Sequence, residues 1–161
     1  MISTTFLSVK SQDNNSYDQL LQTYYKGTVE LIKPAQLNHE LETDSSIIIL
    51  DTREKNEYKV SRLKNAIYAG YDNFNIKKFK NLPKDSKIVV YCSIGARSEN
   101  IGEKLNSKGF NNVYNLYGGI FEWKNLGYPV YDSNSAETEN VHVYSKEWGV
   151  WLEKGNKIYD K

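Results

Sequence analysis

Two short apolar runs, each ending in polar side chains capable of chemistry, constrain the fold of this chain more than any other feature. They are SIIILDTR (46–53) and KIVVYC (87–92), and both are dominated by isoleucine and valine. An unbroken apolar run of this length is typical of a strand that is buried on both faces. Such strands occur in parallel sheets covered by helices, so the chain is expected to contain one.

Helix-like and extended segments alternate along most of the remaining chain. Helices are predicted at 17–26, 33–42, 54–63, 97–109 and 120–127, with a weak helical turn at 75–82, and strands at 29–32, 46–53, 65–70, 87–92 and 112–119. This alternation predicts an α/β fold with a central, parallel, five-stranded sheet and helices on both faces.

The chain is expected to form one main domain with two flanking segments. With 161 residues it is long enough for a single core, which we place at 17–131, after a flexible N-terminal segment at 1–16. Residues 132–161 form a C-terminal extension, in which a polar linker (132–140) precedes the apolar VHVYSKEWGVWL. This apolar surface predicts packing on the domain; the alternative is a docking surface for a partner or for a second copy of the chain, giving a homodimer.

Charge and cysteine content exclude several classes of function. The chain has 21 basic and 20 acidic residues and a net charge of +1, which predicts neither a nucleic-acid partner nor a membrane surface. One cysteine excludes an intrachain disulfide, a cysteine-based zinc cluster and a CxxC redox pair. The N-terminus lacks the features of a signal peptide, and we expect a cytoplasmic protein.

The single cysteine follows the second apolar run and opens the segment CSIGARS (92–98). Cys92 and Asp51 both stand at carboxyl ends of predicted strands, where ligands bind in sheets of this type. The chain must turn after Cys92, with Gly95 supplying conformational freedom, before a helix opens at Arg97. Main-chain N–H groups of such a turn, the helix dipole and an arginine all favour the thiolate, so the segment predicts a nucleophile in an anion-binding cradle.

Several interpretations of the role of Cys92 have to be compared. A protease would need a histidine base, and His39 and His142 are both far from Cys92 in sequence. A buried core thiol has no use for a glycine turn and an arginine. Phosphoryl transfer and sulfur transfer both use such a cradle, but cysteine phosphatases place one residue more between cysteine and arginine. The shorter loop encloses a smaller space, which favours a single extra sulfur atom.

Three motifs, in this order, resemble the rhodanese family of single-domain sulfurtransferases. They are ILDTREKNEY, which resembles the family's D-x-R-x-x-x-E-[YF] segment, YCSIGARS, which resembles its active-site loop, and NVYNLYGGIFEWKNLGYPV, which resembles its double glycine and tryptophan helix. The resemblance covers residues 28–130. It departs from the family pattern at Ser61, Arg62 and Leu63, and at Lys64 and Asn65, in a connecting turn.

The resemblance implies a role for each matching residue. Cys92 would be the nucleophile that carries a persulfide, and Arg97 would help to hold an anionic donor. Asp51 and Arg53 would be structural and form an ion pair with Glu57 behind the loop. The cradle for the terminal sulfur would be formed by the backbone amides of Ser93, Ile94, Gly95, Ala96, Arg97 and Ser98.

The expected function is therefore sulfur transfer from a small-molecule donor, thiosulfate or a persulfide, through a Cys92 persulfide. The acceptor would be cyanide, a thiol or a cysteine of a partner protein, and no metal or organic cofactor is implied. Two alternatives stay open: a non-catalytic binding or regulatory module with the same fold, and a cysteine-dependent phosphatase.

Overall fold

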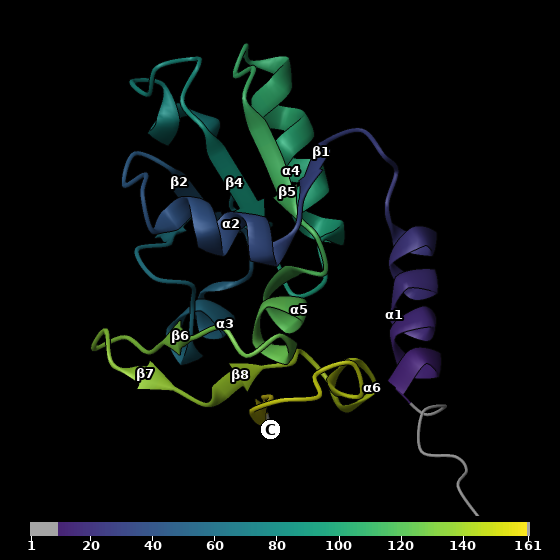
Figure 1. The fold of residues 1–161 in the computed structure, drawn as a ribbon. Helices are drawn as coiled ribbons and strands as arrows, with labels where there is room; N and C mark the ends of the chain where they lie inside the picture. Colours follow the sequence, from purple (N-terminus) through teal and green to yellow (C-terminus); the bar gives the residue numbers. More distant parts are fainter. Residues whose placement is uncertain (1–9, 161) are drawn as a thin grey trace, which may run out of the picture.

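Five parallel strands form the central sheet of the computed structural model, which describes residues 10–160 (Figure 1). Their order across the sheet is β1-β5-β4-β2-β3. Their bounds are β1 (Glu30–Ile32), β2 (Ile48–Asp51), β3 (Ile67–Tyr68), β4 (Ile88–Tyr91) and β5 (Val113–Leu116). The predicted α/β class and the five-stranded parallel sheet are both confirmed. The two runs that predicted it, β2 and β4, are hydrogen-bonded neighbours near the centre of the sheet.

Helices cover both faces of this sheet. They are α1 (Lys10–Tyr24), α2 (Pro34–Leu41), α3 (Lys55–Val60), the 3-10 helix η1 (Ile76–Phe79), α4 (Ala96–Ser107), α5 (Gly119–Asn125) and α6 (Lys146–Gly149). Successive strand side chains point to opposite faces. Accordingly Ile49 and Val89 belong to a core cluster shared with α2 and α5, whereas Leu50 and Val90 belong to a second cluster shared with η1 and α4. Both faces are buried, which is why these runs are apolar without interruption.

The first helix begins earlier and ends earlier than the predicted bounds of 17–26. Residues 10–16, part of the segment predicted to be flexible, are helical, because α1 begins at Lys10 rather than at Tyr17. Tyr17 and Leu21 anchor the helix in the core. Extending an anchored helix through serine and asparagine costs only about 0.5 kcal/mol per residue relative to alanine, so α1 continues toward the N-terminus. Residues 1–9 lie outside the described residues. Within 10–160, no helix has the length and apolar character needed to cross a bilayer.

The C-terminal extension packs beside α3 and α5 (Figure 1). Its first strand, β7 (Glu137–Thr138), pairs antiparallel with β6 (Val130–Tyr131), which comes just before the extension. Its other two strands, β8 (Asn140–His142) and β9 (Asn156–Ile158), pair in parallel with each other. Val141, Val143 and Leu152 are fully buried in the same core cluster as α2 and α5.

The predicted polar linker at 132–140 is part of this structure rather than a loose connection. Asp132 Oδ1 accepts hydrogen bonds from the backbone N–H groups of Asn134 (2.8 Å) and Ala136 (3.0 Å). Such bonds from an aspartate to its own turn favour a tight hairpin. The polar composition of this stretch therefore reflects a β-turn between β6 and β7.

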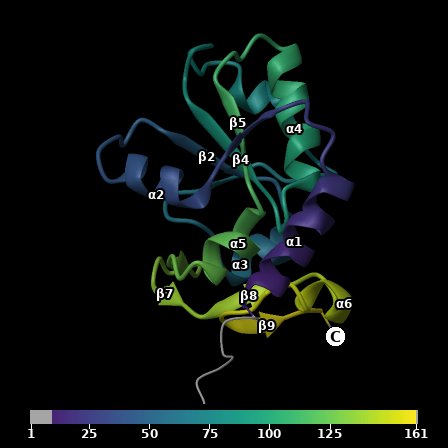
Figure 2. The ribbon, with the colours of Figure 1, turned by 45° about the vertical axis from the view of Figure 1, so that its right-hand side comes forward.

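The extension also contacts the N-terminal helix (Figure 2). The rings of Tyr24 and Trp148 meet edge to face with centroids 5.4 Å apart, and those of Tyr17 and Trp151 stack at 5.5 Å. Aromatic pairs of this kind contribute about 0.5–1.5 kcal/mol beyond their buried area. Segments from the two ends of the described chain are thus joined at one place.

Candidate active site

Cys92 follows β4 directly and begins the turn that leads into α4. Its side chain is buried, and its Sγ accepts a hydrogen bond from the backbone N–H of Gly95 at 3.2 Å. Gly95 has a φ of +105°, and a Cβ placed there would lie 2.3 Å from the hydroxyl oxygen of Tyr25. Only glycine fits this turn, as the sequence predicted from the need for conformational freedom.

The carbonyl groups of the turn are all held away from the sulfur. Cys92 O accepts a hydrogen bond from Ile120 N (2.9 Å), and Ser93 O accepts one from Phe121 N (3.1 Å). Ile94 O accepts from Tyr25 Oη (2.6 Å). Gly95 O accepts from Glu99 N (3.1 Å) and from Asn115 Nδ2 (2.9 Å). In a trans peptide the carbonyl and the next N–H point in opposite directions. Fixing these carbonyls outward therefore directs the N–H groups of residues 93–96 inward, and the bond from Gly95 N to the sulfur is one direct result.

The double glycine at the start of α5 makes two of these bonds reachable. A Cβ on Gly119 would lie 2.4 Å from Cys92 O and 2.5 Å from Ser93 O, and the residue has a φ of +58°. A side chain at this position would therefore collide with the backbone of the cysteine turn. The glycine lets the first N–H groups of α5, which lack partners within a helix, reach these carbonyls.

Two side chains that the sequence analysis missed complete the frame of the turn. Tyr25 donates to Ile94 O and accepts from Gly118 N at 2.8 Å; burial raises the pKa of its hydroxyl far above the usual range, so it stays a donor. Asn115 is fully buried in β5, and its Oδ1 accepts from Ser98 Oγ at 2.7 Å. A polar asparagine inside the apolar run VYNL was the available signal.

Arg97 is held by a carboxylate rather than left free for a donor. Its Nη1 and Nη2 donate to the two oxygens of Glu57 at 2.7 and 2.8 Å, and Nη2 also donates to Ser93 Oγ at 3.1 Å. Burial raises the pKa of the Glu57 carboxyl, but hydrogen bonds from Arg97 and the charges of Arg97 and Arg53 outweigh it and leave the pKa lowered. The pair is therefore charged on both sides, and its net charge is near zero.

Asp51 and Arg53 form a separate buried pair. Arg53 donates through Nε and Nη2 to Asp51 at 3.0 and 2.6 Å, and Nη2 also donates to Ser61 O at 2.6 Å. Tyr91 Oη donates to Asp51 Oδ2 at 2.6 Å. The expected pairing of Asp51 and Arg53 with Glu57 is wrong: these two bind each other, because Glu57, at the start of α3, faces Arg97.

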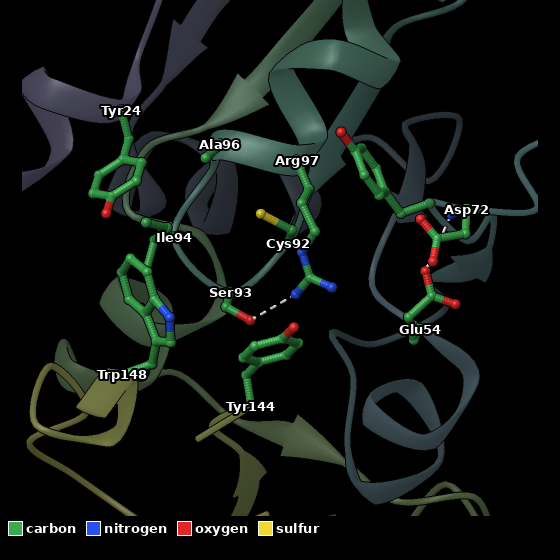
Figure 3. A pocket seen from close by; sticks show the side chains of 11 residues that line it. Tyr24, Glu54, Asp72, Cys92, Ser93, Ile94, Ala96, Arg97, Tyr144 and Trp148 are labelled. Carbon is green, nitrogen blue, oxygen red and sulfur yellow. Dashed lines mark hydrogen bonds between the residues drawn. The ribbon is translucent and has the colours of Figure 1, made fainter. Parts of the chain in front are cut away.

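A pocket of about 350 Å³ opens above the cysteine turn (Figure 3). It is lined by Tyr24, Glu54, Tyr71, Asp72, Cys92, Ser93, Ile94, Ala96, Arg97, Tyr144 and Trp148. Of the predicted site residues, the structure thus brings Cys92, Ser93, Ile94, Ala96 and Arg97 to one pocket. The other predicted residues do not line it. Glu57, Gly95 and Ser98 belong to the hydrogen-bond network of the cysteine turn, and Asp51 and Arg53 form the separate buried pair. The aromatic wall was missed; the tyrosines and tryptophan near both chain ends were its only sequence signal.

This arrangement combines a thiol, inward-facing amides and a pocket large enough for a small molecule. Residues 33–126, more than half of the chain, match the family described as Rhodanese-like domain. The chain belongs to that family. The resemblance inferred from three motifs is thereby confirmed, and the matched segment of this rhodanese-like domain contains the whole cysteine turn.

Curated relatives carry a more specific name. The chain is 30% identical over 139 residues to a tRNA uridine(34) hydroxylase of Bdellovibrio bacteriovorus, covering 75% of this chain and 38% of that protein. It is 31% identical over 152 residues to a protein of the same name from Rickettsia rickettsii, covering 81% and 58%. The rhodanese-like chain thus spans less than two thirds of the length of these relatives.

Solved structures agree on the fold. A rhodanese-like domain from Anabaena superposes with a TM-score of 0.59 at 25% identity, covering 63% of this chain and 78% of that one. A thiosulfate sulfurtransferase from Pseudomonas aeruginosa gives a TM-score of 0.61 at 15% identity, covering 87% and 26%. At that identity the second likeness shows the fold alone.

Proposed function

We propose that this rhodanese-like protein is a sulfurtransferase that carries a sulfane sulfur as a persulfide on Cys92. The observation that supports it best is the cysteine turn, whose carbonyls are bonded outward while Gly95 N donates to Sγ. Inward N–H groups stabilise a thiolate and also the terminal sulfur anion of a persulfide. A thiol buried for packing alone would need neither this turn nor a pocket beside it.

The proposed cycle has two steps. The Cys92 thiolate attacks the outer sulfur of a donor such as thiosulfate; a sulfur–sulfur bond to Cys92 forms, the donor's own sulfur–sulfur bond breaks, and sulfite leaves with the electron pair. The thiolate of an acceptor then attacks the terminal sulfur, which gives the acceptor persulfide and restores the Cys92 thiolate. Cys92 is the only cysteine in the sequence, so in the proposed cycle the acceptor thiol comes from outside these 161 residues.

The test is sulfur loading followed by intact mass measurement. Wild type incubated with thiosulfate should gain one sulfur atom, lose it to a reducing thiol, and form thiocyanate when cyanide is added. Cys92→Ser should do none of these, with circular dichroism checking its fold. Equal activity of the two proteins would refute the assignment. A folded wild type that gains no sulfur would favour a non-catalytic module, and hydrolysis of an aryl phosphate would favour the phosphatase.

We propose one second candidate function, in which the protein takes part in the modification of a uridine in tRNA and needs Cys92 for it. Two observations favour it: the name of the curated relatives, and an aromatic pocket wall on which a base could stack. Nucleoside mass spectrometry of tRNA incubated with wild type and with Cys92→Ser tests it. A modified uridine formed only by wild type supports this candidate, and unmodified tRNA beside normal sulfur loading opposes it.

A further inference from the structure

The pocket above Cys92 combines a floor from the family-matched segment with a wall from outside it. Residues 33–126 supply the cysteine turn together with Glu54, Tyr71 and Asp72. The other aromatic side chains come from outside: Tyr24 stands at the end of α1, and Tyr144 and Trp148 belong to the C-terminal extension. Sulfur chemistry at the turn can therefore be shared across the family, while the substrate that reaches it depends on this chain's own wall.

Tyr144 is held in a costly backbone conformation to form that wall. Its φ is +67°, in the left-handed region, which costs a residue other than glycine about 1–2 kcal/mol. Its N–H donates to His142 Nδ1 at 3.1 Å, and its ring lies 5.7 Å from the Arg97 guanidinium carbon. The ring is nevertheless 61% exposed, so burial does not explain the strain. Strain of this kind, kept at the edge of a pocket, indicates a functional constraint.

Aromatic faces and carboxylates stand on different sides of the pocket (Figure 3). Tyr24 and Trp148 lie together on one side, and Glu54 and Asp72 lie on the other, linked by a hydrogen bond from Asp72 N to Glu54 Oε1 at 3.1 Å. Apart from Arg97, no lysine or arginine belongs to the described residues that line the pocket.

Arg97, the cation of the pocket lining, does not offset these carboxylates. Arg97 is compensated by Glu57, whose two oxygens it binds at 2.7 and 2.8 Å. Glu54 and Asp72 then leave the lining with an excess of negative charge, to which the persulfide adds once Cys92 has been loaded. For the loaded protein an ammonium group is therefore favoured over a further anion, because the carboxylates and the aromatic faces attract it.

On the basis of the proposed persulfide chemistry, we propose that the sulfur acceptor is a small aminothiol, with a cationic amine close to its sulfur. A pocket of about 350 Å³ is of the size that takes small molecules. With the amine between the carboxylates and the aromatic faces, the thiol of such a molecule can approach the Cys92 persulfide.

The transfer step balances without a further reactant. The acceptor thiol first releases its proton to solvent, and its thiolate attacks the terminal sulfur of the Cys92 persulfide. A new sulfur–sulfur bond forms on the acceptor, the bond to Cys92 Sγ breaks, and the electron pair returns to Cys92 as the thiolate. The ammonium group keeps its proton throughout and offsets the negative charge of the attacking sulfur.

The experiment compares two acceptors of opposite charge on the persulfidated protein. The rate at which the persulfide is discharged is measured by intact mass with cysteamine, which is cationic, and with 3-mercaptopropionate, which is anionic. Asp72→Asn removes one carboxylate of the pocket lining; Asp72 is exposed, and its side chain makes no hydrogen bond among the described residues. Asp85→Asn, in an exposed turn at the other end of β4, is the matched control.

We expect Asp72→Asn to lower the ratio of cysteamine rate to mercaptopropionate rate about threefold, as for one partly screened charge pair, and Asp85→Asn to leave it unchanged. Each thiol is compared with itself across variants, so its intrinsic reactivity cancels. Tyr144→Asn keeps a residue type that tolerates the left-handed backbone but removes the ring, and should lower the cysteamine rate selectively.

The outcomes separate this inference from the function on which it rests. A wild type that takes up no sulfur overturns both. A wild type that loads normally, but whose ratio is the same in Asp72→Asn and Asp85→Asn, overturns the aminothiol and leaves the sulfurtransferase intact. A ratio that rises in Asp72→Asn overturns the aminothiol as well, because loss of a carboxylate cannot favour the cationic thiol through its charge.

Discussion

Replacing Glu57 with glutamine tests the network that holds Arg97 against the cysteine turn. Glu57 is 1% exposed, and its two oxygens receive Arg97 Nη1 and Nη2 at 2.7 and 2.8 Å, while its Oε2 also accepts from Glu54 N at 2.8 Å. Glutamine keeps one carbonyl oxygen but replaces the other with an NH₂ group. One guanidinium N–H would then face a second donor, and the buried positive charge would lose its counterion.

The expected cost follows from this geometry. A hydrogen bond to a charged group contributes about 1.5–3 kcal/mol, and breaking a buried ion pair costs about 3–5 kcal/mol. The Arg97 side chain is 23% exposed, so water partly compensates it and the lower part of the range applies, near 3 kcal/mol. For a protein of this length, that change lowers Tm by roughly 6–12 °C.

Thermal unfolding followed by circular dichroism measures this difference. Glu103→Gln is the matched control, because Glu103 also forms an ion pair, with Lys26 at 3.0 Å, but on the surface. It should change the free energy of unfolding by less than about 1 kcal/mol. If Glu57→Gln proves no more destabilising than Glu103→Gln, the buried pair does not support the turn as we argue.

Two further predictions concern the same turn. Gly119→Ala should slow sulfur loading more than about tenfold, because its Cβ would lie 2.4 Å from Cys92 O. Gly109→Ala is the control, since Gly109 also has a positive φ (+85°) but no atom within 4 Å of its Cβ, and it should load at the wild-type rate. Equal loading rates of the two variants would contradict the close approach of α5 to the turn. The lowered pKa of Glu57 means that its pairing with Arg97 stabilises the fold fully above pH 4.5 and progressively less as pH falls through the folded pKa. Urea unfolding across that range should show a steeper slope in wild type than in Glu57→Gln, and identical slopes would contradict it.

The parts of the fold that follow from local pattern could be predicted from the sequence. Uninterrupted apolar runs specify strands buried on both faces, and β2 and β4 are such strands. The cysteine turn could be predicted equally well, because few sites other than an anion-binding cradle combine a thiol, a glycine and an arginine at such short spacing. Ion pairs were harder: Asp51, Arg53 and Glu57 are close in sequence, yet the third binds an arginine forty residues away.

The rest depends on contacts between distant segments, which no local pattern encodes. Tyr25 and Asn115 fix the turn from another loop and another strand, and each looked like an ordinary residue of its own element. Tyr144 and Trp148 were recognised as part of an apolar extension, but only the packing of α6 against α1 places them over Cys92. Such placement is decided by tertiary packing, which overrides what a window of sequence shows.

The division between the cysteine turn and the wall above it has a consequence for how such proteins diversify. A substitution in the turn disturbs a closed set of main-chain bonds and risks the chemistry itself, whereas one at Tyr144 or Trp148 changes only what is admitted. The side chains of the extension that face the pocket can thus vary, while Val141, Val143 and Leu152 keep the segment fixed in the core. If the protein acts as proposed, new sulfur-accepting partners would then arise by substitutions on this one face, above an unaltered cysteine turn.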